Sequence, residues 1–261
     1  MHTPHPFLIR FNETFGIRYY GLAYLAGFVG AAWLLHRYFR AGRSPLDTNA
    51  LLDLMTALLA GVIVGGRLGY FLLYQPSVLF HDPLVLVRLW EGGMASHGGF
   101  LGVMFAMAWF TRKREVRFLQ VSDLITSTAP LGLMLGRIAN FLNGELWGKQ
   151  GEVPWAMIFE QTGGGPFPRH PSQLYEALLE GLVLFAYMQW RFWRTPVAQQ
   201  APGRLSGEFL VAYAAARAVC EVFREPDAGL IFGLSRGSFY SIFVAIGGIV
   251  LMGMTRPKPA R

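Results

Sequence analysis

Charged residues are scarce in this 261-residue chain. Asp, Glu, Lys and Arg make up 15% of it, hydrophobic residues make up 53%, and the mean hydropathy is +0.35. Soluble globular domains carry about 25% charged residues, because most of their surface faces water. The composition therefore excludes an ordinary soluble domain and predicts an integral membrane protein.

Cysteine is nearly absent, since Cys220 is the only one. A single cysteine excludes an intrachain disulfide. No second His or Cys lies at metal-ligand spacing, so we expect no metal site and no cofactor. The N-terminus also lacks the basic segment and apolar core of a cleaved leader peptide, so we expect it to remain on the mature protein.

Long apolar runs are abundant. A helix needs about 20 residues to cross about 30 Å of hydrocarbon. The runs predict an all-α membrane protein with about seven transmembrane helices, which are expected at residues 17–39, 51–75, 92–111, 118–142, 173–192, 207–224 and 237–255. We see no internal repeat, and we expect one polytopic membrane domain over residues 1–261.

Basic residues are concentrated in alternate connections between these runs. They follow the first, third, fifth and seventh runs, at Arg37, Arg40, Arg43, Arg112, Lys113, Arg114, Arg117, Arg191, Arg194, Arg204, Arg256, Lys258 and Arg261. Cytoplasmic loops retain such residues, so the N-terminus is predicted outside and the C-terminus in the cytoplasm. This retention signal accounts for most of the net charge of +7, so we expect no nucleic-acid partner.

Polar side chains interrupt the predicted spans near their outer ends. An ionisable group inside a membrane costs about 2.5 kcal/mol or more and commonly marks a functional site. Within the sixth run the polar residues recur at spacings of four, four and three, which places them on one helical face. The embedded groups are Arg67, His97, Arg137, Asn140, Tyr213, Arg217, Glu221 and Arg224. Because they share one depth, we predict a cavity for a phospholipid headgroup.

Each of these residues also has an ordinary interpretation. Arg217 and Glu221 fit an i,i+4 ion pair, and Arg67 and Arg224 could extend toward outer headgroups. No acid lies three or four residues from Arg137, so we expect a phosphate to supply its counter-charge. His97 is either a packing residue or a base that accepts a proton near neutral pH.

The connection at residues 144–172 is rich in Gly, Pro and aromatic residues. It is too polar to span a membrane and too long for a plain turn. On the orientation above, it predicts a small periplasmic head.

Four motifs, read in order, carry a family resemblance. They are HGGFLG at 97–102, GRIANFLNGELWGK at 136–149, PRHPSQLYEALLEG at 168–181 and RAVCEVFREPD at 217–227. Together they resemble the bacterial phosphatidylglycerol:prolipoprotein diacylglyceryl transferase family. The resemblance implies that a diacylglyceryl group passes from phosphatidylglycerol to the lipobox cysteine of a prolipoprotein signal peptide. A thioether forms and glycerol phosphate leaves, at the periplasmic side of a bacterial inner membrane.

The resemblance also implies site residues at matching positions. Arg137 and Arg217 are the candidates for stabilising the leaving phosphate, and His97 is a candidate base. Substrate-binding roles are implied or inferred for Tyr20, Arg67, Asn140, Glu145, Gly148, Tyr213, Glu221 and Arg224. The segment Arg236-Gly237-Ser238 departs from the family's usual Met-Gly-Gln, so roles in the last outer loop carry over less directly. An anion or phospholipid transporter that uses the same arginines is the alternative function.

Overall fold

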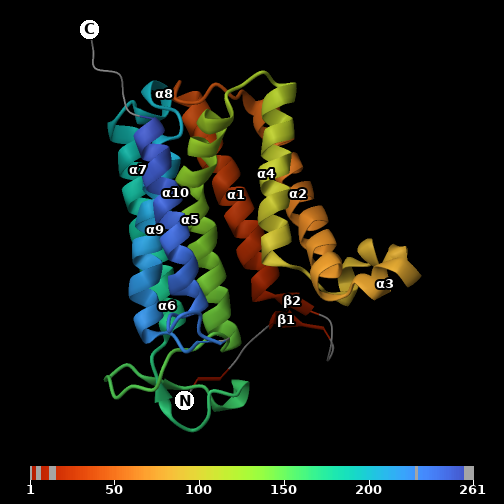
Figure 1. Cartoon of the computed structure of the whole chain (residues 1–261), viewed down its shortest axis with the longest axis vertical. Coiled ribbons are helices and arrows are strands. Elements are labelled where there is room, and N and C mark those ends of the chain that lie inside the picture. Colours follow the sequence, from red (N-terminus) through yellow and green to blue (C-terminus); the bar gives the residue numbers. More distant parts are fainter. Residues whose placement is uncertain (1, 4–6, 12–15, 227–228, 256–261) are drawn as a thin grey trace. The chain divides into compact units, whose positions relative to one another are not determined.

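The computed structural model describes residues 2–3, 7–11, 16–226 and 229–255 (Figure 1). All seven predicted segments are helical in it. The longer helices are α1 (Tyr19–Arg40), α2 (Thr48–Tyr74), α4 (Ser96–Lys113), α5 (Phe118–Asn143), α9 (Arg204–Phe223) and α10 (Arg236–Met254). The remaining predicted segment is one continuous run made of α6 (Ser172–Glu176), η4 (Ala177–Val183) and α7 (Leu184–Arg194).

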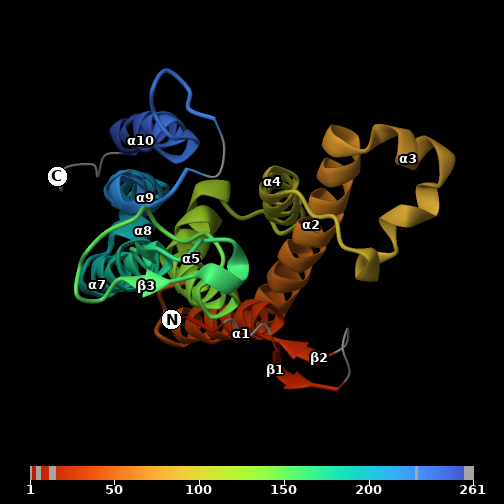
Figure 2. The same ribbon diagram turned by 90° about the horizontal axis from the view of Figure 1, so that it is seen from below.

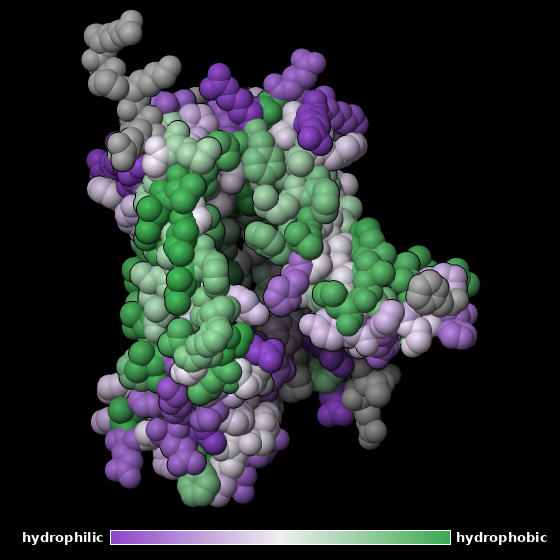
Figure 3. Space-filling view, in the orientation of Figure 1, coloured by the Kyte–Doolittle hydropathy of each residue, from purple (hydrophilic) through white to green (hydrophobic). Residues whose placement is uncertain are grey.

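Three helices of the described chain, α2, α5 and α10, are long and apolar enough to cross a membrane by length and composition. Ile242, Phe243, Ile246, Ile249 and Val250 leave much of α10 exposed as apolar surface. Figure 3 shows the face over α9 and α10 as hydrophobic along its middle and hydrophilic at both ends. This banding is what a lipid-facing surface requires.

The chain forms two compact units. The first contains residues 1–34 and 123–261, and the second contains residues 35–122. The first unit therefore holds the start of α1, most of α5 and the elements from α6 to α10, and the second holds the end of α1, α2 to α4 and the first residues of α5.

In the first unit, α10 packs on α9, and α7 lies beside α9 (Figure 2). Between α6 and α7 the stretch η4 is π-helical, and Gly181 within it lies against Met134 of α5. At the N-terminal end of α9, buried Asp123 accepts hydrogen bonds of 2.7 Å from Gly203 N and Ser206 N. These bonds satisfy amide donors that a helix leaves open at its first turn.

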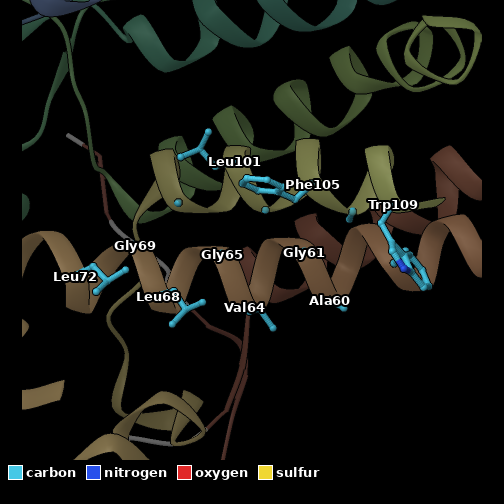
Figure 4. A pocket seen from close by; sticks show the side chains of 14 residues that line it. Ala60, Gly61, Val64, Gly65, Leu68, Gly69, Leu72, Leu101, Phe105 and Trp109 are labelled. Atoms are coloured by element: carbon cyan, nitrogen blue, oxygen red, sulfur yellow. The ribbon is translucent and has the colours of Figure 1, made fainter. Parts of the chain in front are cut away.

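In the second unit, glycines bring α2 and α4 into backbone contact (Figure 4). A Cβ at Gly61 or Gly65 would collide with main-chain oxygens of α4, and a Cβ at Gly98 or Gly102 would collide with those of α2. Such stripes of small residues are the usual way in which membrane helices approach closely. An apolar groove of about 600 Å³ runs along the pair.

Arg67 organises the connection between α2 and α4, which contains α3 (Pro76–His81), η1 (Pro83–Leu86) and η2 (Leu89–Glu91). Its side chain donates to main-chain oxygens of Val85, Leu86, Arg88, Gly92 and Gly93. Arg67 is only 2% exposed, so the interpretation that it extends toward outer headgroups is wrong. Five carbonyl acceptors explain how the cation is tolerated there.

Short elements outside the long helices were not predicted. β1 (Phe7–Arg10) pairs antiparallel with β2 (Gly16–Arg18), and β3 (Met157–Ile158) pairs antiparallel with β4 (Pro168–Arg169). The connection at 144–172 also contains η3 (Glu160–Thr162), and α8 (Val197–Gln200) precedes α9. The all-α expectation therefore describes the helical body but missed these small ladders.

Candidate functional site

Glu176 lies at the centre of an ion cluster in the first unit. Its Oε2 lies 3.0 Å from Arg137 Nε, and its Oε1 lies 3.0 Å from Arg217 Nη1 and 2.8 Å from Arg224 Nη1. Glu180, one helical turn later, lies 3.4 Å from Arg137 Nη2 and 3.3 Å from Arg217 Nη1. Three helical segments therefore meet through two carboxylates that are fully buried.

The cluster corrects the prediction about Arg137. Its counter-charges are Glu176 and Glu180 from the neighbouring helical run, so a phosphate is not needed to balance it. Spacing along one helix identifies only acids on the same helix, which is why these two were missed. The general signal was nevertheless present, because two acids four residues apart inside a predicted span call for buried cations.

The predicted pair between Arg217 and Glu221 is confirmed, since their side chains form an ion pair along α9. Arg224 follows the helix and is 5% exposed, so the interpretation that it extends toward outer headgroups is wrong. Its backbone pairs with Gly148, which joins the 144–172 connection to the cluster. Tyr213 lies one turn before Arg217 on α9, and its ring stacks on Phe209 with centroids 6.0 Å apart.

A second group of predicted residues gathers around Asn140, which lies one turn after Arg137 on α5. Asn140 donates from Nδ2 to the Tyr20 hydroxyl, and that hydroxyl donates to Glu145 Oε2 over 2.8 Å. Because Arg137 and Asn140 are three residues apart, the guanidinium and the amide share a helical face. The structure thus brings Tyr20, Asn140 and Glu145 together beside the ion cluster.

The segment after Glu145 is fixed by the start of α6. Gln173 Nε2 donates to Glu145 O over 2.6 Å, and Ser172 Oγ donates to Leu146 O over 3.0 Å. At Gly148 a Cβ would lie 2.5 Å from His170 O and 2.6 Å from Phe223 O. The close backbone approach explains why this position holds glycine.

The start of α10 touches the cluster as well. A Cβ at Gly237 would collide with Glu221 Oε1 and would lie 2.9 Å from Arg217 Nε. Arg236 and Ser238 depart from the family pattern, but Gly237 between them is retained, and the site requires its small size.

His97 and Arg67 belong to the second unit. His97 lies in the first turn of α4 with its ring exposed, and the adjacent Gly98 contacts α2. The N–H groups of Arg67 donate to main-chain oxygens of the connection between α2 and α4. Its predicted substrate contact remains a prediction, while its structural role is clear.

The first unit can stabilise negative charge at a defined place. Three guanidinium groups are held by buried carboxylates, so their positions are set before any ligand arrives. Preorganised cations of this kind lower the energy of charge that develops on a leaving phosphate oxygen. Arg137 is 19% exposed at its side chain and is the most accessible of the three.

Comparisons with known proteins agree with this chemistry. Residues 6–254 match the family model described as prolipoprotein diacylglyceryl transferase. A protein of Gluconacetobacter diazotrophicus is 49% identical over 94% of this chain and 88% of its own length. A protein of Idiomarina loihiensis is 48% identical over 95% of this chain and 91% of its own length. Both relatives are named phosphatidylglycerol-prolipoprotein diacylglyceryl transferase.

Proposed function

The chain belongs to the prolipoprotein diacylglyceryl transferase family, and we infer from this that it transfers the diacylglyceryl group of phosphatidylglycerol to prolipoproteins. The near-complete coverage of relatives that carry this name is the observation that carries the inference. The transporter alternative has no support, because the family and these relatives are transferases.

We propose that the acceptor is a lipobox cysteine in the signal peptide of the precursor. Its thiolate sulfur forms a bond to the carbon of the diacylglyceryl group that carries the phosphate, and the bond from that carbon to the phosphate oxygen breaks. The electron pair stays on the phosphate, which leaves as glycerol phosphate. Arg137 and Arg217 stabilise this charge, while Glu176, Glu180 and Glu221 hold the guanidinium groups in place.

We further propose binding roles for the residues around the cluster. Tyr20, Asn140 and Glu145 form one hydrogen-bonded group. The backbones of Gly148 and Arg224 pair with each other next to it. The lipid headgroup reaches both groups from the periplasmic side, and Tyr213 completes the α9 face that carries Arg217. Phosphatidylglycerol, which donates the diacylglyceryl group, enters from the membrane lipids of the bilayer.

A reconstituted assay tests the function directly. Purified protein is mixed with headgroup-labelled phosphatidylglycerol and a peptide that contains a lipobox cysteine. We expect release of labelled glycerol phosphate together with a thioether-linked peptide. The same peptide with Cys replaced by Ser should release no label. Headgroup release that does not depend on the thiol, or movement of lipid without release, would contradict the proposal.

His97 is proposed as the base that removes the thiol proton, with positioning of the lipid headgroup as its rival role. Replacement of His97 by Gln removes a base but keeps hydrogen bonding. A free thiol has a pKa of about 8.5, so raised pH supplies thiolate without a base. We expect His97→Gln to be slow at neutral pH and to recover as the pH rises above the thiol pKa. An equal loss at every pH would assign His97 to positioning instead.

The topology of the site is also a proposal. The seven helical segments match the seven predicted spans, and the alternation of basic loops favours an outer N-terminus and a cytoplasmic C-terminus. On that orientation the cluster faces the periplasm of a multi-pass inner-membrane protein, and residues 144–172 form a periplasmic head on a single polytopic domain. Labelling of single cysteines with a membrane-impermeant reagent measures this orientation. We expect residues 144–172 to react from the periplasmic face and residues 41–47 only from the cytoplasmic face.

A further inference from the structure

Two buried amide oxygens beside the site have no hydrogen-bond partner in the part of the chain that the structure describes. They are Asn143 Oδ1 and Gln173 Oε1. Asn143 is 9% exposed and Gln173 is fully buried. A buried acceptor without a donor is destabilising, so an exception of this kind calls for an explanation.

The orientation of both amides is fixed by Glu145. Asn143 Nδ2 donates to Glu145 Oε1 over 3.3 Å, and Gln173 Nε2 donates to Glu145 O over 2.6 Å. A carboxylate and a carbonyl can only accept, so each amide must turn its nitrogen toward Glu145. Rotation of either amide would place oxygen against oxygen. Both amide oxygens are therefore held in place as acceptors that await a donor.

Gln173 is linked to the ion cluster by one helical turn, and Asn143 is linked to it by a chain of hydrogen bonds. Gln173 lies three residues before Glu176, which binds all three arginines. Asn143 shares the Glu145 carboxylate with the Tyr20 hydroxyl, and that hydroxyl accepts from Asn140 Nδ2. Asn140 lies three residues after Arg137 on α5, so these two side chains are neighbours on the helix surface. The cations and the unpaired acceptors are thus adjacent parts of one site, with exposed Glu145 at its edge.

A ligand that satisfies both parts must carry an anion and hydroxyl donors a few bonds apart. The headgroup of phosphatidylglycerol has this chemistry, because its phosphate bears a glycerol with two free hydroxyls. Resting on the function proposed above, we propose that Asn143 and Gln173 accept hydrogen bonds from these hydroxyls. They are specificity-determining residues that select a glycerol headgroup.

Donor lipids that differ only in hydroxyls test this. Phosphatidylpropanol keeps the phosphate and the three-carbon headgroup of phosphatidylglycerol but has no hydroxyl. A site built to bond a hydroxyl rejects an analogue that lacks it. For the wild-type protein with a lipobox peptide, we expect kcat/KM to be roughly 10- to 100-fold lower with phosphatidylpropanol than with phosphatidylglycerol.

Substitutions in the protein, each assayed with both lipids, form a thermodynamic cycle that isolates the contact between the amide and the hydroxyl. Gln173→Met and Asn143→Leu keep the approximate volume and remove the amide oxygen. We expect each to lower kcat/KM with phosphatidylglycerol roughly tenfold and to change it little with phosphatidylpropanol. Gln189→Met is the matched control, because the Gln189 oxygen already accepts from Trp193 Nε1 over 3.2 Å. It should leave the ratio between the two lipids unchanged.

The outcomes separate the proposal from the function on which it rests. If wild-type protein makes no thioether with phosphatidylglycerol, the proposed function fails. If it makes the thioether but uses both lipids equally well, the headgroup proposal is overturned. An equal loss with both lipids in folded Gln173→Met and Asn143→Leu would also overturn it, because it would show a purely structural role. If one variant does not fold, the other variant and the wild-type lipid comparison still decide.

Discussion

Replacement of Arg217 by alanine is expected to abolish measurable thioether formation while the protein still inserts in the membrane. Arg217 is ion-paired with Glu176, Glu180 and Glu221. Its removal takes a cation from the leaving phosphate and breaks the ion pair of Glu221, whose carboxylate then repels the same charge, while Glu176 and Glu180 keep Arg137. Loss of one preorganised donor alone costs about 10²- to 10³-fold in rate, and the carboxylate of Glu221 adds to this.

The rate of labelled headgroup release, measured on detergent-purified protein of verified helical content, checks this prediction. Arg217→Lys should also be nearly inactive, because one ammonium cannot reproduce the guanidinium fork that meets three acids. Arg204→Ala provides the control. It removes an arginine that pairs with Glu208 over 3.2 Å in the same unit, where Arg191 still neutralises the acid. Near-normal turnover by folded Arg217→Ala would remove Arg217 from the mechanism.

Gly65→Leu is expected to prevent folded protein from accumulating, because no space for a side chain exists between α2 and α4. Even a Cβ at Gly65 would collide with Gly98 O and approach Gly102 Cα within 2.8 Å. These are main-chain atoms, so relief requires the helices to separate. Gly65→Ala should therefore cost about 1–3 kcal/mol of stability, as overpacked cores do.

Thermal unfolding of the purified protein measures the effect, and Gly99→Ala is the matched control. Gly99 lies beside Gly98 in α4, but a Cβ there would meet only Val62 O at 3.8 Å, which is an ordinary contact. We expect Gly99→Ala to unfold near the wild-type temperature and Gly65→Ala well below it. Equal midpoints for both variants would show that close packing of α2 on α4 does not limit stability.

The sequence allowed the helices to be predicted because each one is a continuous apolar run of about the length that a bilayer-spanning helix needs. All seven predicted segments are helical, with ends within a few residues of those expected. The pair between Arg217 and Glu221 could also be predicted, because it lies within one helix and follows from spacing alone.

Contacts between helices could not be predicted in the same way. The partners of Arg137 are 39 and 43 residues away in the chain, and no periodicity encodes which helix faces which. The burial of Arg67 could not be predicted from the sequence for a related reason. Its partners are main-chain carbonyls, which every residue carries and which therefore leave no trace in composition.

The π-helical stretch η4 sets the rotational phase between the two ends of its helical run. On one side of it, Glu176 reaches Arg217 and Arg224; on the other, Arg191 reaches Glu208, so both ends must face the same neighbour, α9. Each residue turns an α-helix by about 100°, and i→i+5 bonding fits extra chain into a turn. The number of residues in η4 is therefore constrained in addition to the identity of Glu180 and Gly181: a one-residue insertion or deletion would rotate one set of charges away from its partners.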